Sequence, residues 1–365
     1  MDISIEQKII IAASRLTDDS ISDNIIALIN KEINWSEIIH YAAKNRVLLL
    51  LNHNFAAYGF QKYIPAYYRR LLNDSMYSNY VMNNERLSEL KKIKVQMKQK
   101  GVLFAPVKGA YLIDNVYKNR CIRMTNDIDV LIRRRDVSIL ENIMKENGYI
   151  LGHYDNITGN ITVPERKEKM IYKTKMYNLL PFIKLSDIVP KTAIIFDFSF
   201  ALDFSLDITP VDEMLESSIS TDSGIELLPE HFFIHMCCHH YREASNVAWI
   251  LLGKDLNLIK FCDVREFILQ KMNSESINKA VQFAKKHKLE KAVYFTVYFT
   301  REIYNDGYET EILQSLNMED ETFLYQFGEN DSNELQMRKK DFWTSLFSDH
   351  NRDEIKEPPK YEILI

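Results

Sequence analysis

Glycine and proline are scarce in this sequence, with 10 and 9 of them among 365 residues. So few turn-forming residues favour a helix-rich chain with few tight hairpins. We find neither low-complexity segments nor a repeat period. Long hydrophobic runs are missing as well. Apolar stretches such as VLLLLNHNFAAYGF are interrupted by polar residues well short of the roughly 18–20 apolar positions of a membrane span. We therefore expect no membrane-spanning segment.

Cysteine is also rare, and the four thiols are Cys121, Cys237, Cys238 and Cys262. They have neither C-x-x-C spacing nor the pattern of a disulfide framework, so we interpret them as reduced thiols. The N-terminal segment MDISIEQKIIIAASRL lacks the basic region and the small-residue cleavage site of a signal peptide. Together these features predict a cytoplasmic protein.

The charge balance excludes another class of protein. The 46 basic and 51 acidic residues give a formal net charge of −5. A mildly acidic chain is not a general binder of nucleic acid or anionic membranes, although a local basic patch stays open. The apolar content of 46% is that of an ordinary folded protein, and the length predicts two or three structural units.

The hydrophobic pattern divides the chain into three regions. Apolar residues at spacings of three and four predict helices through residues 1–100, the longest of them at 76–101. The same pattern returns from about residue 206 and continues toward the C-terminus. We therefore predict an N-terminal helical region at 1–100, a core domain at 101–205 and a C-terminal helical region at 206–365.

The core alternates strands with helices. Short apolar or β-branched runs predict strands at 102–107, 127–132 and 192–202. A short helix is expected after the first strand, and a helix between Asp136 and Gly148 after the second. The pattern between 149 and 190 is weak and indicates a hairpin or an irregular insertion. The order predicts an α/β or α+β core, a small mixed sheet covered by helices.

Two aspartates stand out in the segment MTNDIDVLI, because Asp127 and Asp129 interrupt an apolar strand. Side chains alternate along a strand, so both carboxylates project from one face, roughly 6.5–7 Å apart. Neighbouring carboxylates raise each other's pKa, and a divalent cation removes that cost. Mg²⁺ prefers a few carboxylate oxygens together with substrate phosphates. The pair is therefore interpreted as a metal clamp. The alternative is a turn or capping role for one aspartate and an ion pair with the arginine run 133–135 for the other.

Three further features favour the metal interpretation. Lys108 and Gly109 lie between a predicted strand and a helix, where glycine lets backbone N–H groups approach a phosphate and lysine adds a positive charge. An ordinary strand-to-helix turn is the alternative there. Asp197 lies within the apolar strand IIFDFSFAL, where an acid needs a partner or a metal. Arg123, four residues before Asp127, is placed to reach a phosphate.

This order of motifs resembles the nucleotidyltransferase superfamily, which has a DNA polymerase β-like core. More narrowly, it resembles the bacterial family usually labelled uncharacterised nucleotidyltransferases, with a pattern near LKG-x-x-L, R-x-x-x-D-[IL]-D-[IL]-L-[IV], G-[YF] and [VI]-D-L-H-W. The matching segments are VKGAYL at 107–112, RMTNDIDVLI at 123–132, GY at 148–149 and FDFSF at 196–200. Weaker similarity extends the resemblance from about residue 33 to 270.

The resemblance implies an enzyme that transfers a nucleoside monophosphate from a nucleoside triphosphate (NTP), such as ATP, with Mg²⁺ or Mn²⁺. Asp127 and Asp129 would hold the metal on the triphosphate. All three aspartates, including Asp197, would hold a second metal and help to deprotonate an acceptor hydroxyl. The acceptor, a hydroxyl or phosphate group on a small molecule, a peptide natural product, a protein or RNA, is left open. So are the base and the oligomeric state.

The chain departs from the resembling proteins at two positions. The best-studied superfamily members have Gly-Ser at the phosphate turn, where this chain has Gly109 and Ala110, and the family's histidine after the third acid is Ser199. One alternative is a sugar or phosphoryl-type transferase that modifies a peptide natural product with a nucleotide-activated donor, because D-x-D also binds nucleotide-sugar diphosphates. A sugar transferase would normally need a longer nucleotide-binding α/β half before the D-x-D. Here only about 25 residues separate the first predicted strand from the D-x-D, which counts against this alternative. The other alternative is a catalytically degenerate nucleotide-binding protein.

Overall fold

The computed structural model describes residues 3–16, 20–29, 31–221, 224–328, 335–349 and 351–355. The chain divides into two compact units. Unit 1 combines Met1–Tyr77 with Met236–Ile365, and unit 2 is Ser78–His235. The helical regions predicted at the two ends of the sequence thus contribute to one unit. The boundaries predicted near residues 100 and 205 stay predictions, which limited proteolysis can check.

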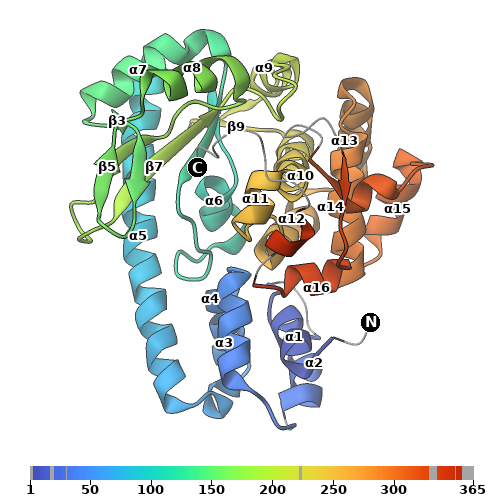
Figure 1. The fold of residues 1–365 in the computed structure, drawn as a ribbon. Coiled ribbons are helices and arrows are strands. Elements are labelled where there is room, and N and C mark those ends of the chain that lie inside the picture. Colours follow the sequence, from blue (N-terminus) through green and yellow to red (C-terminus); the bar gives the residue numbers. More distant parts are fainter. Residues whose placement is uncertain are drawn as a thin grey trace. The chain divides into compact units, whose positions relative to one another are not determined.

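Unit 1 is built almost entirely of helices, drawn in blue and in yellow to red in Figure 1. Its elements are α1 (Ile5–Ala12), α2 (Ile21–Ile29), α3 (Trp35–Lys44), α4 (Leu48–Ala57), η1 (Phe60–Tyr63), the start of α5 (Ala66–Gln99), the part of α10 (Pro229–Ala244) from Met236 on, α11 (Val247–Leu251), α12 (Leu258–Lys271), α13 (Ser274–His287), α14 (Glu290–Ile303), α15 (Tyr308–Leu316), η4 (Thr322–Tyr325), β10 (Gln326–Phe327), β11 (Gln336–Met337), α16 (Phe342–Leu346) and η5 (Arg352–Glu354).

Buried hydrogen bonds join the two sequence segments of unit 1. Asn45 is fully buried, and its side-chain oxygen accepts a hydrogen bond from the backbone N–H of Leu258, at 2.9 Å. The backbone N–H of Leu16 donates to the carboxylate of Glu266, at 2.8 Å. Buried polar groups cost free energy unless they are paired, so these bonds favour one arrangement of the two segments.

Unit 2 contains the sheet and the helices around it. Its elements are the rest of α5, β1 (Phe104–Pro106), α6 (Gly109–Leu112), the π-helical turn η2 (Ile113–Tyr117), β2 (Ile128–Ile132), η3 (Arg134–Asp136), α7 (Val137–Glu146), β3 (Ile150–Leu151), β4 (His153–Asp155), β5 (Asn160–Thr162), α8 (Arg166–Lys175), β6 (Phe182–Leu185), β7 (Ala193–Ser199), α9 (Thr209–Glu216), β8 (Ile219–Thr221), β9 (Gly224–Glu226) and the start of α10.

Five strands form a mixed sheet in the order β1-β2-β7-β6-β3. The central pair, β2 and β7, is parallel, with Asp129 opposite Asp197 in the register, and the other pairs are antiparallel. This confirms the predicted fold class, a small mixed sheet with helices.

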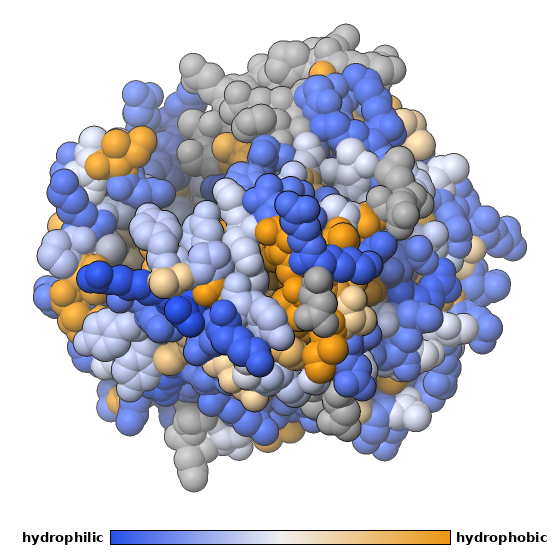
Figure 2. Space-filling view, turned by 90° about the horizontal axis from the view of Figure 1, so that it is seen from below, coloured by the Kyte–Doolittle hydropathy of each residue, from blue (hydrophilic) through white to orange (hydrophobic). Residues whose placement is uncertain are grey.

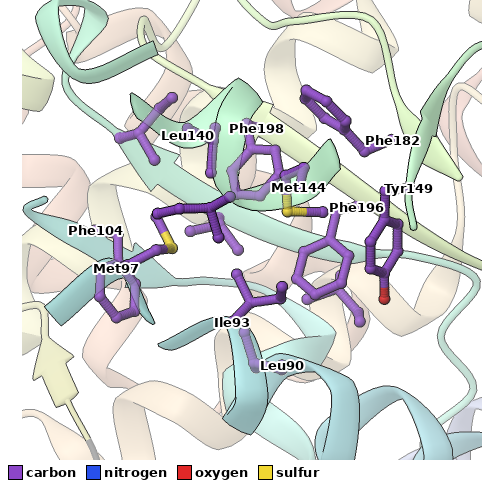
Figure 3. Close-up of a cluster of buried hydrophobic side chains, with 14 of the residues drawn as sticks. Leu90, Ile93, Met97, Phe104, Leu140, Met144, Tyr149, Phe182, Phe196 and Phe198 are labelled. Carbon is purple, nitrogen blue, oxygen red and sulfur yellow. The ribbon is translucent and has the colours of Figure 1, made fainter. Parts of the chain in front are cut away.

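The hydrophobic core of unit 2 lies on one face of this sheet. Ile128, Val130 and Ile132 of β2 project into it together with Ile194, Phe196 and Phe198 of β7. Figure 3 shows Phe196 and Phe198 in this core together with Leu90, Ile93 and Met97 of α5 and Leu140 and Met144 of α7. Because side chains alternate along a strand, the residues between them project from the opposite face. Asp129 and Asp197 are two of these.

The observed elements differ from the predicted ones mainly between residues 149 and 190. The predicted hairpin is present as β4 and β5, but helix α8 and strand β6 were not predicted. Asp127 lies immediately before β2, whereas the sequence placed it inside the strand. The helix predicted at 76–101 is observed as α5, which begins ten residues earlier, at Ala66.

Among the described residues, no helix is long and apolar enough to cross a membrane. Figure 2 shows one face of the molecule that is mostly hydrophilic, with hydrophobic residues gathered near its middle.

Candidate active site

Two neighbouring strands bring two of the three predicted acids side by side. Asp129 on β2 and Asp197 on β7 are register partners in a parallel pair, whose strands lie about 4.8 Å apart. Both side chains leave the sheet on the face opposite the phenylalanine core. The packing of Phe196 and Phe198 on the core face therefore fixes the direction of Asp197 between them.

Asp127 lies in the bend that leads into β2, where it is half-buried. The hydroxyl of Thr125 donates a hydrogen bond to the backbone carbonyl of Asp127, at 3.1 Å. Such a short-range bond shapes the bend before the strand.

The three carboxylates act on one another electrostatically. Burial, at 5% exposure, is the main cause that raises the pKa of Asp129 to about 7, and the negative charges of Asp127 and Asp197 contribute to this rise. The ammonium of Lys108 acts in the opposite direction. The site thus places two further acids near a buried carboxylate and favours the approach of positive charge.

Lys108 supplies one such charge from the turn after β1. Its Nζ lies 2.7 Å from Oδ1 of Asp129, and both side chains are largely buried. The Lys108 backbone has φ +49° and ψ −133°, a conformation that residues with a Cβ rarely adopt. Strain of this kind costs on the order of 1–3 kcal/mol and is found mainly at functional sites.

Gly109 follows in a turn that has no room for a side chain. A Cβ at this position would lie 2.4 Å from Oγ1 and 2.8 Å from Cβ of Thr125, and 3.4 Å from a guanidinium nitrogen of Arg123. Helix α6 is only four residues long before the π-helical turn. Little macrodipole builds up over one turn, so positive charge for a phosphate must come mainly from side chains.

We expect Gly109→Ala to destabilise unit 2 by about 1–3 kcal/mol, because Thr125 must move out of the bend before Asp127. Chemical denaturation followed by circular dichroism measures this change. The control is Gly148→Ala, where the added Cβ meets no atom within 4 Å and only the positive φ of +82° opposes the substitution. Gly148→Ala thus measures the cost of a positive φ alone, and a loss below about 0.5 kcal/mol in Gly109→Ala would contradict the proposed steric conflict.

Asp197 has polar neighbours from the segment that sequence analysis left undefined. The side-chain amide of Asn178 donates to Oδ1 of Asp197, at 3.0 Å. Tyr172, on α8, lies close enough that the Asp197 charge adds to burial in raising the pKa of its phenol. Helix α8 therefore lies near the third acid.

Helix α5 holds the loop that carries Arg123. The amide of Asn83 donates to the carbonyl oxygens of Arg120 and Arg123, at 2.8 and 3.0 Å, and Asn79 donates to Cys121, at 2.8 Å. Arg123 itself is 8% exposed and donates to the carbonyl of Met124. This fixes the guanidinium beside Gly109.

Arg86 is a charged residue near the site that sequence analysis missed. It lies three residues after Asn83 on α5, so it follows the same side of the helix. Burial lowers the pKa of its guanidinium, and the negative charges of Asp127 and Glu85 oppose that shift. Its Nε is buried and has no hydrogen-bond partner among the described residues. A single arginine within a helical segment has no sequence pattern that would place it near the three acids.

The donor chemistry of the site fits a divalent cation. Among the residues that the structure describes, no group of three or more His, Cys, Asp or Glu side chains is already arranged as a ligand set. Instead, the Lys108 ammonium neutralises Asp129. Three carboxylates within electrostatic reach of one another nevertheless provide the oxygen ligands that Mg²⁺ and Mn²⁺ take.

A separate pocket of about 430 Å³ lies between α5, α6 and β9. Tyr111 and Lys94 are among its lining residues, but none of the six predicted site residues is. It is therefore distinct from the carboxylate cluster.

Residues 31–305 match the family model described as "Uncharacterised nucleotidyltransferase", and the match covers most of the chain. The chain belongs to this family. It is therefore an enzyme of the nucleotidyltransferase class, as the resemblance of its motifs implied. The matched range includes the whole of unit 2 and parts of unit 1. No curated protein matches the chain.

The nucleotidyltransferase thus brings its predicted site residues into one region of unit 2. Asp127, Asp129, Asp197 and Lys108 interact electrostatically, and Arg123 lies beside Gly109. The catalytic, metal-binding and phosphate-binding roles of these residues stay predictions. Arg86, Asn178 and Tyr172 are additional neighbours that only the fold reveals.

Proposed function

We propose that the enzyme transfers a nucleoside monophosphate from an NTP to a hydroxyl or phosphate acceptor, with Mg²⁺ or Mn²⁺ held by Asp127, Asp129 and Asp197. The observation that carries this proposal is the buried carboxylate of Asp129 between two further acids and Lys108. Binding of a cation would relieve the electrostatic repulsion among the three carboxylates. When bound, the cation would neutralise the negative charge that builds up on the phosphates during transfer.

Positive side chains around the cluster account for binding of the donor. Lys108 and Arg123 flank the Gly109 turn, where a backbone without a side chain can approach a phosphate. Arg86 adds a half-buried guanidinium that already interacts electrostatically with Asp127. Residue 110 is alanine and has no side-chain hydroxyl to bind a phosphate. The backbone and the cationic side chains would therefore position the triphosphate.

The transfer step uses the third acid. The acceptor oxygen forms a bond to the α-phosphorus of the NTP, and the bond from that phosphorus to the bridging oxygen breaks. Pyrophosphate leaves with the electron pair, and a hydroxyl proton on the acceptor passes to a carboxylate oxygen of Asp197. The amide of Asn178 holds Asp197 in place for this role. Phosphoryl-type transfers depend mainly on positioning and electrostatics, which this set of residues supplies.

The activity is tested by incubating the full chain with each of the four labelled NTPs and Mg²⁺ or Mn²⁺. We expect pyrophosphate release that requires the metal, together with labelled product once a suitable acceptor is present. Turnover of nucleotide-sugars in place of NTPs would contradict the proposal and favour a sugar transferase. Binding of NTPs with no pyrophosphate release from any acceptor pool would favour a degenerate nucleotide-binding protein.

Arg86→Gln is expected to raise KM for the NTP about tenfold or more, because a charged hydrogen bond of roughly 1.5–3 kcal/mol to the donor is lost. The smaller effect expected on kcat separates this binding role from a role in the chemistry. Steady-state kinetics at several NTP concentrations measure both. The control is Arg70→Gln, at an exposed position of α5 in unit 1, and an equal rise of KM in that variant would contradict the assignment.

A further inference from the structure

Helix α8 carries an unusual concentration of positive charge for an acidic chain. Its sequence, RKEKMIYKTK, has five basic residues and one acid. The acid, Glu168, is buried and pairs with His153. The remaining nearby acid, Glu165, lies at the N-cap end of the helix. The charges of α8 are therefore not balanced by the helix itself.

Three of these cations form a row on the outer side of the helix. Arg166, Lys169 and Lys173 follow the spacing i, i+3 and i+7, which places them on one face, and all three are exposed. Within the described part of the chain, none of the three side chains takes part in an ion pair. Lys167 and Lys175 add two more exposed charges beside the row.

Arg134 connects this row to the strands that carry the acids. It follows β2, and its guanidinium donates to the carbonyl oxygen of Lys173, at 3.1 Å. It also lies over the ring of Phe200, just after β7, at 4.8 Å. The other two arginines of the run are used differently, since Arg133 pairs with Asp136 and Arg135 pairs with Glu216. Of these three arginines, only Arg134 therefore contacts the helix that carries the row.

The chain that follows α8 reaches the third proposed catalytic acid. The side-chain amide of Asn178, three residues after the end of α8, donates to Oδ1 of Asp197, at 3.0 Å. Tyr172 is half-buried on α8 itself, and the charge of Asp197 contributes to raising the pKa of its phenol. The row and Asp197 therefore belong to the same unit and are connected by a short segment of chain.

We propose that the row Arg166–Lys169–Lys173 binds the phosphate backbone of a single-stranded nucleic acid, which is the acceptor of the transferred nucleotide. This inference rests on the proposed function, whose acceptor it identifies. A nucleic-acid strand supplies both features that the site requires: regularly spaced phosphates for the row and a terminal hydroxyl for attack on the α-phosphorus. The bond changes are those of the transfer step above, with the proton of the terminal hydroxyl passing to Asp197.

The test compares two triple variants of the full chain that lose the same charge. One carries Arg166→Gln, Lys169→Gln and Lys173→Gln. The control carries Lys91→Gln, Lys98→Gln and Lys145→Gln, all at exposed positions of unit 2 outside α8. Binding of a labelled single-stranded RNA of about 20 nucleotides is followed by fluorescence anisotropy from 50 to 200 mM NaCl, without NTP.

We expect the α8 variant to bind RNA at least about tenfold more weakly than the natural chain, and the control to change less than about twofold. The slope of the logarithm of the RNA association constant against the logarithm of the salt concentration should fall in magnitude by about 2 in the α8 variant. The reason is that each of the three lost cations would release about 0.7 counterion from a single strand on binding. Equal weakening of both variants, or no RNA binding by the natural chain, would overturn the proposal. So would α8-dependent binding to phosphatidylserine vesicles in place of RNA.

The binding measurement is independent of turnover. If Asp129→Asn binds RNA normally while NTP-dependent labelling is absent even in the natural chain, the proposed transfer fails and the binding surface stands. If NTP turnover occurs and RNA neither binds nor is labelled, the transfer stands and the acceptor assignment fails.

Discussion

Asp129→Asn is expected to lower metal-dependent nucleotidyl transfer by about 10³-fold or more while the fold remains intact. The substitution keeps the size of the side chain and removes the charge that would hold the cation and the triphosphate together. Initial rates of pyrophosphate release at saturating metal measure the loss. Circular dichroism and thermal unfolding without metal should show no loss of stability, because a neutral side chain escapes the burial and repulsion that raise the pKa of Asp129.

The matched control is Asp74→Asn, an exposed aspartate on α5 in unit 1. It removes the same charge from the chain and should leave the rate within about twofold of the natural enzyme. A variant at position 129 that retained full metal-dependent turnover would eliminate the metal assignment of this carboxylate. Unfolding of that variant would instead be detected by its circular dichroism spectrum.

Phe196→Ala is expected to lower the free energy of unfolding by about 3–5 kcal/mol, the largest effect that we predict on stability. Phe196 is fully buried, stacks with Phe198 at 5.6 Å and contacts the edge of Tyr149 at 5.3 Å. Removal of the ring leaves a cavity beneath the central strands and loosens the strand that directs Asp197. Urea unfolding monitored by fluorescence and circular dichroism gives the change.

Ile157→Ala is the control for this prediction, because Ile157 in the same unit is 90% exposed. Its free energy of unfolding should change by less than about 0.5 kcal/mol. A Phe196→Ala variant as stable as this control would contradict the packing of the phenylalanine core in Figure 3.

The central strands were predictable because two physical signals agree there. Apolar residues at alternate positions around Asp129 and Asp197 give a strand with one buried face, and an acid on such a strand projects from the other face. The parallel pairing that places Asp129 opposite Asp197 is a long-range property of the sheet. No pattern within either segment specifies which strands become neighbours, and only the resemblance to a family implied it.

The missed elements lacked such signals. Helix α8 has no apolar stripe with a helical period, since its only apolar residues are Met170, Ile171 and Tyr172 in succession. Strand β6 is four residues long and follows a loop without a clear turn motif. Arg86 lies on a long polar helix far from the aspartates in sequence, and only folding brings it near Asp127.

Our central proposal is that Asp127, Asp129 and Asp197 together hold a divalent cation. The most direct test is a titration of the full chain with Mn²⁺ in the presence of a non-hydrolysable NTP analogue. Electron paramagnetic resonance of free Mn²⁺ measures the bound fraction. We predict saturable binding by the natural chain and by Asp74→Asn, and loss of that binding in Asp129→Asn and Asp197→Asn. Unchanged Mn²⁺ affinity in the last two variants would contradict the account.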